Sequence, residues 1–308
     1  MLHRRGKFMV KRIKIEAIED SRAEFLGMTH VENWVTFTFK NHPGLLLIRN
    51  PFTALGQRYW IRKCLEKYPK KPNKINIDIE RLLHDWWMEC FDNEYCDRRL
   101  QKKLRWTTMG YHHNWDTKVY TEENKTTFPG DLAELSDTVA TYLGFKNFRA
   151  EAAIVNYYHM DSTLSGHTDH SEVNLEAPLI SVSFGQSAIF LIGGEDKNTE
   201  PSAILLNSGD IVVMSKEARL CYHAVPKVLP ASSEPWDKKD SFKTVHSIPS
   251  NLKYVSNKNE VLSLMNGNSD DSVWEPFKTY IEQSRINLNV RQVLNEKQSN
   301  LNSQFIDS

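Results

Sequence analysis

Three residues in the C-terminal half of the chain have the types and the order needed to hold a metal ion. His167 and Asp169 are one residue apart, and His223 follows 54 positions after Asp169 (223 − 169). Side chains at positions i and i+2 of a strand point the same way, so His167 and Asp169 would present an imidazole and a carboxylate to one point. Two histidines and a carboxylate leave three open positions on iron(II), enough for dioxygen and a bidentate 2-oxoacid. The pattern therefore predicts an oxidising iron centre.

This prediction depends on order more than on spacing. The H-x-D pattern is common, and the chain has eleven histidines, so a triad is easily assembled by chance. A single histidine in a β-core is more often a hydrogen-bonded structural residue. His246 is a further candidate ligand, but its surroundings have the composition of a loop. The order strand, H-x-D, several strands, histidine, strand, arginine favours the metal site.

A row of polar residues near the C-terminus would complete such a site. Arg285, Asn287, Asn289 and Arg291 alternate with apolar residues and would share one side of a strand. The planar guanidinium of arginine binds a carboxylate through two hydrogen bonds, so Arg285 could hold the far carboxylate of 2-oxoglutarate. Unpaired arginines facing a β-core would otherwise be costly. The alternative is that the row faces solvent.

The elements that must position these residues change in character near residue 150. Before it, we expect strands at 34–39 and 45–48, a helix at 53–68 that Thr53 could cap, and a helical stretch at 78–91. After it, short apolar runs separated by Gly, Asn, Asp and Pro predict an all-β sandwich or jelly roll with the helices outside. These strand-like runs are 152–158, 179–184, 188–192, 203–206, 211–214 and 288–294.

The chain is accordingly divided into segments of different character. A basic segment and leader is expected at 1–42, a helical lid extension that recognises the nucleotide at 43–149, and the mainly β core at 150–294. A polar insertion at 231–275 interrupts the core before a short helix near 274–283, and a disordered tail is expected at 295–308. The basic, acid-poor start is similar to a mitochondrial presequence, although it is poor in Ser. A solvated basic tail is the alternative.

Composition limits the class of protein. The 308 residues carry no net charge, which argues against a simple polyanion binder, although local basic runs could form a patch. No stretch of eighteen apolar residues occurs, so no membrane partner is expected. The four cysteines form no CxxC pair and are expected as free thiols in a reduced, intracellular setting, namely the mitochondrion, the nucleus or both, or else the cytoplasm. A monomer is expected.

Several motifs together carry a resemblance that covers residues 43–294. The chain resembles the AlkB family of Fe(II)- and 2-oxoglutarate-dependent nucleic-acid dioxygenases, and most closely its animal AlkB homologue 1 group. The matching motifs are Leu104 to Thr107, Gly110 to Asp116, Phe148 to Ala152, Asn156 to Tyr158, His167 to Asp169, Ser183 to Phe190, Ser208 to Asp210 and Arg285 to Arg291.

The resemblance implies a fold and a role for individual residues. It implies a double-stranded β-helix (jelly-roll) core with an N-terminal extension that covers the active site. His167, Asp169 and His223 match the iron ligands, and Arg285 matches the arginine that pairs with 2-oxoglutarate. Further cosubstrate contacts are implied for Asn156, Tyr158, Asn287 and Arg291.

Substrate contacts are the least determined part of the resemblance. Trp106 falls where bacterial relatives have an aromatic residue beside the base, and Tyr111 is a second stacking candidate, whereas ordinary packing is expected for Trp115. Bacterial relatives have an acid two residues after the metal-binding Asp, where this chain has Ser171, with Glu172 next to it. Ser171 and Glu172 are therefore candidate substrate contacts, but base preference cannot be transferred.

The implied activity is oxidation of methylated nucleobases, with tRNA favoured and DNA as the alternative. N-methyl substrates would release formaldehyde, beside the succinate and carbon dioxide formed from 2-oxoglutarate. Two basic runs, from Arg58 to Lys74 and from Arg98 to Arg105, could bind phosphates or could be solvated faces. Rival functions are a protein demethylase or hydroxylase (for example on histones) with the same iron site, an abasic-site lyase, and a binding protein with an inactive jelly roll.

Overall fold

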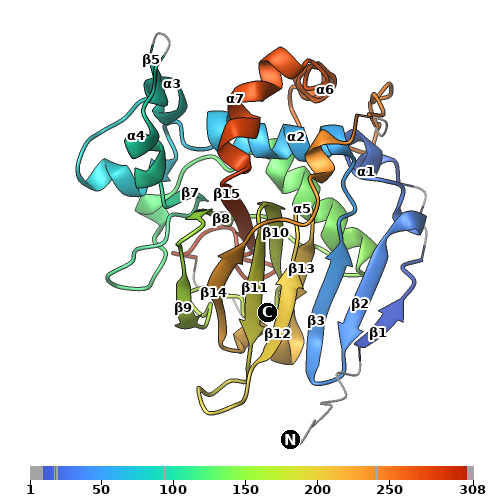
Figure 1. Ribbon diagram of the computed structural model, residues 1–308. Helices are drawn as coiled ribbons and strands as arrows, with labels where there is room; N and C mark the ends of the chain where they lie inside the picture. The colour runs from blue at the N-terminus through green and yellow to red at the C-terminus, as the bar shows by residue number, and fades with distance from the viewer. Residues whose placement is uncertain (1–9, 17, 19, 93–94, 240–241, 304–308) are drawn as a thin grey trace, which may run out of the picture.

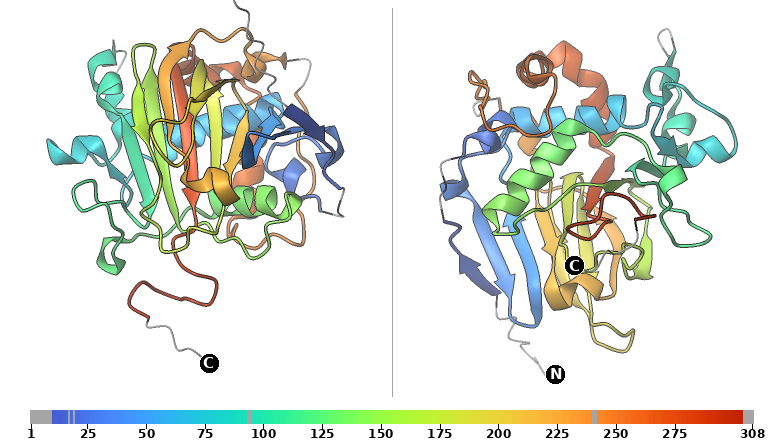
Figure 2. Two further views of the ribbon diagram at one scale, coloured as in Figure 1. Left: turned by 90° about the horizontal axis from the view of Figure 1, so that it is seen from below. Right: turned by 180° about the vertical axis from the view of Figure 1, so that it is seen from behind.

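The computed structural model describes residues 10–16, 18, 20–92, 95–239 and 242–303. Within these residues, a nine-stranded sheet faces a four-stranded sheet, and helices cover the outer face of the larger sheet (Figures 1 and 2). The larger sheet has the order β1-β2-β3-β13-β10-β15-β8-β7-β4, and the smaller sheet has the order β12-β11-β14-β9. This is the jelly-roll core with outer helices that the sequence predicts, and the prediction of the fold is confirmed.

The strands have the following bounds. The larger sheet contains β1 (Val10–Ile13), β2 (Val35–Phe39), β3 (His42–Arg49), β4 (Lys74–Ile75), β7 (Trp106–Gly110), β8 (Ala152–His159), β10 (Leu179–Gly185), β13 (Ile211–Met214) and β15 (Ser284–Arg291). The smaller sheet contains β9 (Leu164–His167), β11 (Ser187–Ile192), β12 (Ser202–Leu206) and β14 (His223–Leu229). A separate hairpin joins β5 (Phe91–Asp92) and β6 (Tyr95–Cys96).

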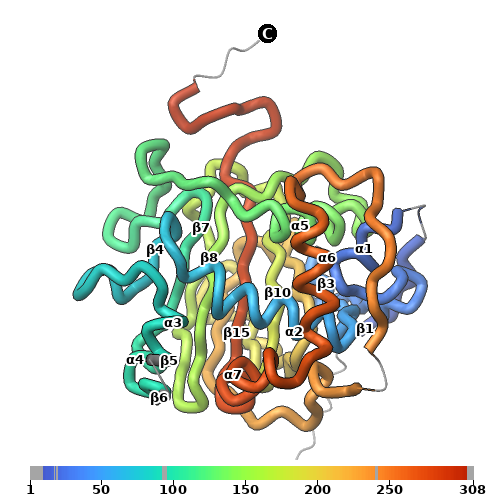
Figure 3. Tube along the Cα trace, turned by 90° about the horizontal axis from the view of Figure 1, so that it is seen from above, coloured from blue at the N-terminus to red at the C-terminus, as the bar shows by residue number. Residues whose placement is uncertain are grey.

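The helices lie mostly on one side of the larger sheet. They are α1 (Arg22–Phe25), α2 (Ala54–Arg62), α3 (Trp86–Cys90), α4 (Arg98–Lys103), α5 (Gly130–Tyr142), α6 (Lys258–Gly267) and α7 (Asp271–Ile281), with short helices η1 (Val31–Asn33), η2 (Lys63–Lys67), η3 (Asn76–Ile79), η4 (Glu122–Asn124), η5 (Lys216–Leu220) and η6 (Pro235–Asp237). Seen from above, α2, α5 and α7 overlie the larger sheet (Figure 3). No helix in the described part of the chain is both long and apolar enough to cross a membrane.

Alternation along β15 divides the two layers of the core. Ile286, Leu288 and Val290 are fully buried in the cluster formed with the helices. The intervening polar side chains point to the other face, toward the smaller sheet, because successive side chains of a strand alternate. β15 lies between β10 and β8, in the interior of the larger sheet. The predicted polar row is thus buried between the sheets and does not face solvent.

The chain passes from one sheet to the other at Gly185. This residue ends β10 in the larger sheet, and β11 in the smaller sheet begins after Gln186. Gly185 has φ +83°, a left-handed conformation that glycine adopts without steric cost. A Cβ placed there would lie 2.4 Å from the carbonyl oxygen of Ser284 in β15. The crossing therefore depends on glycine.

The expected boundary between residues 42 and 43 is wrong. It cuts the hairpin of β2 and β3, and β3 in turn pairs with β13 of the jelly roll. Upstream, Arg22 is buried and forms ion pairs with Glu134 and Asp137 of α5, at 3.0 and 2.5 Å. Residues from β1 onward therefore belong to the core, because their strands extend its sheet. Residues 1–9 of the predicted leader lie outside the described residues.

The helical stretch expected at 78–91 is interrupted. The chain forms η3 and α3, and no helix spans the described residues between them. Ile79 and Leu82 are 83% and 63% exposed, so they provide no apolar stripe that would bury a continuous helix.

The 231–275 insertion is polar in composition but has a buried side. Trp236, Met265 and Trp274 are almost fully buried, and the carbonyl oxygen of Trp236 accepts a 2.7 Å hydrogen bond from buried Arg58 of α2. The segment thus packs over α2 as part of the helical layer.

The expected disordered tail is wrong for residues 295–303. Arg149 donates hydrogen bonds to the carbonyl oxygens of Asn295 and Gln298, at 2.8 and 3.1 Å. The amide of Leu301 donates to Glu122 at 3.0 Å, and its side chain packs on a buried cluster. Residues 304–308 lie outside the described residues.

Candidate active site

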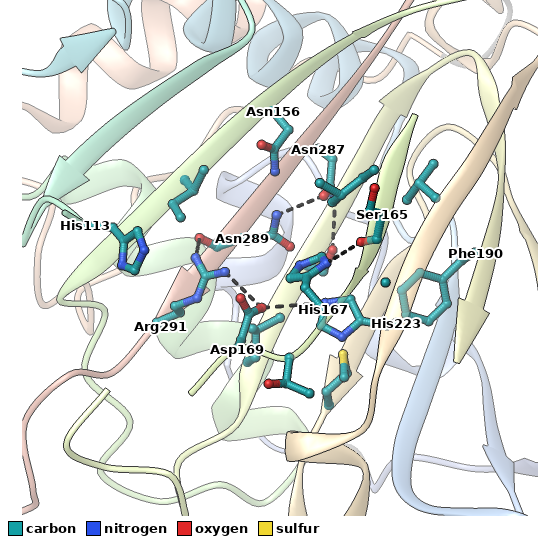
Figure 4. A pocket seen from close by; sticks show the side chains of 18 of the residues that line it. His113, Asn156, Ser165, His167, Asp169, Phe190, His223, Asn287, Asn289 and Arg291 are labelled. Atoms are coloured by element: carbon teal, nitrogen blue, oxygen red, sulfur yellow. Dashed lines mark hydrogen bonds and ion pairs between the residues drawn. The ribbon is translucent and has the colours of Figure 1, made fainter. Parts of the chain in front are cut away.

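The end of β9 and the start of β14 place two histidines side by side. His167 and His223 are Cα partners across these strands, and Asp169 follows two residues after β9. The ligand atoms of the three residues all lie within 4.8 Å of one another, and the side chains converge in Figure 4. In the part of the chain that the structure describes, no other set of three His, Cys, Asp or Glu side chains does so. The structure thus brings together the three predicted ligands, and His246 lies elsewhere.

Backbone carbonyls orient both imidazole rings. Nδ1 of His167 lies 2.9 Å from the carbonyl oxygen of Ser165, and Nδ1 of His223 lies 3.1 Å from that of Cys221. Because a carbonyl can only accept, each Nδ1 donates its proton and each Nε2 keeps a free lone pair. Burial lowers the pKa of His223, against the opposing effect of Asp169. The neutral ring that a metal requires is thus favoured.

Two arginines hold the carboxylate ligand Asp169 from opposite ends. Nη2 of Arg291 lies 2.9 Å from its Oδ2, and Nη1 of Arg219 donates to its carbonyl oxygen at 2.6 Å. Burial alone would raise the pKa of Asp169, but Arg291 and the two histidines outweigh burial and hold this pKa well below its usual range. Asp169 is therefore ionised at neutral pH, and its donor set with the two histidines fits iron(II).

Glu172 joins the two arginines into a closed ring beneath Asp169. One of its carboxylate oxygens accepts from Arg291 at 3.1 Å and from the hydroxyl of Tyr120 at 3.2 Å. The other accepts from Arg219 at 2.9 Å. Glu172 is 5% exposed, and both of its oxygens are already engaged. Its expected role as a substrate contact is therefore not supported, and it positions the metal ligand through Arg291 and Arg219.

Arg285 has unused donors deep between the sheets. It is 1% exposed, and its Nη2 donates to the hydroxyl of Ser183 at 2.9 Å. Its Nε and Nη1, and the hydroxyl of Tyr158, have no hydrogen-bond partner among the described residues. The guanidinium carbon lies 5.0 Å from the centre of the Tyr158 ring. Buried donors without partners are rare, and this set fits the distal carboxylate of 2-oxoglutarate.

A row of amides connects Arg285 to the triad. Asn287 donates to the hydroxyl of Ser181 at 2.8 Å and accepts from Asn289 at 2.9 Å. Asn156 faces them from the neighbouring strand β8 (Figure 4). The predicted cosubstrate residues Asn156, Tyr158, Arg285, Asn287 and Arg291 all line one cavity with the metal ligands.

This cavity has a volume of about 590 Å³, and its lining includes a partly exposed aromatic residue. Trp115 lines it and is 39% exposed, so the expectation of ordinary packing for Trp115 is wrong. The ring of His113 lies 4.8 Å from that of Trp115, and burial lowers the pKa of His113 to about 4. A neutral imidazole and an indole thus form one wall.

The other predicted substrate contacts have different outcomes. Ser171 lines the cavity. Trp106 is half-buried and packs against Trp115, with ring centroids 5.4 Å apart, so it stands behind the residue that lines the wall. Tyr111 is 1% exposed and its hydroxyl donates to Glu122 at 2.7 Å. Tyr111 is therefore a core residue, and its predicted substrate contact is wrong.

Sequence reasoning missed Arg219, Tyr120 and His113. Their roles depend on contacts between distant segments, such as the 2.9 Å ion pair of Arg219 with Glu172 across 47 positions. The charged residue between Ala218 and Leu220, close to His223, was the available signal for Arg219.

A jelly roll with two histidines and a carboxylate facing a buried, unpaired arginine defines a mononuclear iron oxygenase that uses a 2-oxoacid. The 2OG-Fe(II) oxygenase superfamily matches residues 44–291. The chain is 40% identical over 292 residues to nucleic acid dioxygenase ALKBH1 of Mus musculus, covering 92% of this chain and 72% of that protein. It is 32% identical over 278 residues to tRNA demethylase abh1 of Schizosaccharomyces pombe, covering 83% and 81%.

A solved structure shares the fold. "The structure of OsALKBH1" superposes with a TM-score of 0.50 at 18% identity, covering 82% of this chain and 97% of that one. The chain belongs to the 2OG-Fe(II) oxygenase superfamily and, within it, to the AlkB homologue 1 family. It is an Fe(II)- and 2-oxoglutarate-dependent dioxygenase, as the sequence predicts.

Proposed function

We propose that this dioxygenase removes or oxidises methyl groups on the bases of nucleic acid, with tRNA favoured over DNA. The observation that carries the proposal is the partly exposed Trp115 in the wall of the cavity that the candidate metal ligands line. A flat indole next to an oxidising centre is suited to stack on a base, which must leave its helix to reach a buried metal. The mouse and S. pombe relatives, named as a nucleic acid dioxygenase and a tRNA demethylase, support it.

Each part of the site has a distinct task in this reaction. When bound, iron(II) and 2-oxoglutarate supply oxidation of a methyl group by dioxygen, with release of succinate and carbon dioxide, and an N-hydroxymethyl product then loses formaldehyde. His167, Asp169 and His223 would hold the metal, and Arg285 with Tyr158 would receive the distal carboxylate. Arg285 and Tyr158 are buried, which keeps water from the distal carboxylate that they would hold.

Nucleoside mass spectrometry tests the proposal. The pure protein would be incubated with bulk tRNA or methylated single-stranded DNA, iron(II), ascorbate and 2-oxoglutarate, and succinate would be measured in parallel. We expect one methylated nucleoside to decrease only when 2-oxoglutarate is present. The variant His223→Ala should lose this activity by more than about 100-fold, because a metal ligand is missing.

The matched control is His246→Ala. His246 is an exposed histidine whose ring is hydrogen-bonded to Thr244, so its loss should leave activity unchanged. Succinate formation without any nucleoside change, in the presence of peptide turnover, would move the substrate to protein. A nucleic-acid activity that survives His223→Ala would instead point to lyase chemistry.

A further inference from the structure

The first basic run of the sequence is neutralised within the fold. Its residues lie on α2, η2, the loop that follows and the start of β4, and all but one form ion pairs with acids. These pairs are Arg58–Asp237, Arg62–Glu66, Lys63–Asp131, Lys67–Glu66, Lys70–Asp85 and Lys71–Asp78. Lys74 contacts Asn124. This run therefore presents little free positive charge to a partner.

The second basic run remains free. It comprises Arg98, Arg99, Lys102 and Lys103 of α4 and the following Arg105, and it is called the basic ridge below. All of these residues are exposed. Lys103 pairs with Glu80 at 3.3 Å, but both side chains are largely exposed, and such pairs contribute little. The other members have no ion pair among the residues that the structure describes.

The basic ridge works against the stability of its own helix. Arg98 and Lys102, and likewise Arg99 and Lys103, stand at i and i+4, where like charges destabilise a helix by roughly 0.2–0.5 kcal/mol a pair. The fold holds α4 in place from outside. Trp86 donates to the carbonyl oxygen of Leu100 at 3.2 Å, and Asn76 donates to that of Lys103 at 2.8 Å. A bound polyanion would turn this repulsion into attraction.

The basic ridge leads directly to the wall of the active-site cavity. Arg105 precedes Trp106, the first residue of β7, which pairs with Asn156 in the cavity. Trp106 packs on Trp115 at 5.4 Å, and Nζ of Lys118 lies 5.7 Å from the Trp115 ring. In Figure 1, α4 lies beside the end of the larger sheet that carries β7 and β8. Free cations and an exposed aromatic ring therefore follow one another toward the cavity that the candidate metal ligands line.

We propose that the basic ridge binds the phosphates of the nucleic-acid strand whose target base enters the cavity. This inference rests on the proposed function and adds the surface that holds the strand. A row of cations that ends at an aromatic residue is the combination by which proteins bind single strands, with phosphates on the cations and a base on the ring. An acidic protein would match the cations but would leave the adjoining Trp115 and cavity without a role.

Salt-dependent binding tests this surface. Fluorescence anisotropy would follow labelled tRNA and a short single-stranded DNA on the full chain loaded with manganese(II) and 2-oxoglutarate, over a series of salt concentrations. The variant is Arg98→Gln/Arg99→Gln/Lys102→Gln. Each lost phosphate contact lowers the magnitude of the slope of log K against log salt by about 0.7–1, so the loss of three contacts should lower it by about 2–3. The affinity at moderate salt should fall by at least about 10-fold.

The control removes the same charge elsewhere. Lys40, Lys146 and Lys297 are exposed and lie outside the ridge, so Lys40→Gln/Lys146→Gln/Lys297→Gln should leave both slope and affinity nearly unchanged. With iron(II), the ridge variant should raise the KM for nucleic acid while kcat at saturating substrate and the KM for 2-oxoglutarate stay the same, because no ridge residue lines the cavity. Circular dichroism would verify that α4 and the fold are intact.

Different failures have different meanings. Equal effects of the two triple variants would overturn the basic ridge and leave the proposed function standing, since binding would then follow total charge. Absence of nucleic-acid binding and turnover by the unaltered protein would overturn both. Normal nucleic-acid binding by the ridge variant, with lost binding to an acidic protein, would reassign the ridge to a protein partner.

Discussion

Arg285 is an arginine in the middle of a sheet whose charge no carboxylate of the described residues pairs with. Burial lowers the pKa of Arg285, and Tyr158 opposes this shift. A buried, unpaired charge lowers the free energy of unfolding unless a bound anion pairs with it. This imbalance is the strongest local evidence for an anionic cosubstrate.

The variant Arg285→Lys should raise the KM for 2-oxoglutarate by about 10–100-fold. Lysine keeps the charge but not the planar pair of donors, and a charged hydrogen bond contributes about 1.5–3 kcal/mol. Succinate formation against 2-oxoglutarate concentration measures this KM. Arg81→Lys, at an exposed arginine, is the control, and equal KM values for the two variants would contradict the assignment.

The variant Glu172→Gln should weaken metal binding without removing a metal ligand. Buried Arg219 and Arg291 would lose their shared counter-charge, which costs about 3–5 kcal/mol of folding free energy when a buried pair is broken. Loss of a residue that orients a metal ligand typically weakens metal affinity by about 10–100-fold. Calorimetric titration with manganese(II) and urea denaturation measure the two effects. Glu176→Gln, at an exposed acid, should change neither.

At the scale of single elements, the crossing between β10 and β11 can be tested with two glycines of like conformation. Gly185 and Gly144 have φ +83° and +82°, but a Cβ at Gly144 meets nothing within 4 Å. Both alanine variants should lose about 1 kcal/mol from backbone strain. Gly185→Ala should lose clearly more, because its Cβ collides with the Ser284 carbonyl. Urea denaturation compares them, and equal losses would show that the crossing can adjust.

The strands that hold the site were predictable because each is an apolar run between turn residues. β8, β10, β11, β12 and β13 lie within a residue or two of the expected runs. The polar alternation of β15 predicted a row on one side of the strand, but it left open whether that row faces the core or solvent. α5 was missed because it is buried over most of its length, so its sequence shows no polar face with helical period. The tail was misjudged because its few anchors, such as Leu301 on Glu122, join residues 179 positions apart.

The metal and cosubstrate residues could be predicted, whereas the wall of the cavity could not. His167 and His223 stand at strand ends, where side-chain direction follows from the pleat, and Asp169 follows β9 by two residues. Trp115 and Tyr111 lie four residues apart, yet one is exposed and the other is buried. Their different exposure depends on where the 112–121 segment packs against Glu172 and β8. No local sequence pattern predicts that contact.

At the scale of the molecule, the 231–275 segment joins the helical layer through Arg58 and Trp236. Trp236→Ala should cost about 3–5 kcal/mol, the usual loss for a large buried aromatic residue. Trp115→Ala, at the exposed indole of the cavity wall, should cost little stability but should lower nucleic-acid turnover. Thermal denaturation and nucleoside turnover distinguish the two variants. A loss of stability in Trp115→Ala, with a loss of turnover alone in Trp236→Ala, would contradict both assignments.

The short strand β9 has a consequence for how metal loading can be observed. It lies at the edge of the smaller sheet, its Leu164 and His167 have Cα partners on β14, and the register shifts between these pairs. Short edge strands of this kind open readily in the native state. A metal ion bound by both His167 and His223 would crosslink β9 to β14. The amide protons of residues 164–167 would then exchange with solvent slowly, because β9 could no longer open. In the metal-free protein these amide protons would exchange fast. The exchange rate of β9 therefore reports how much of the protein has iron bound, without an activity assay.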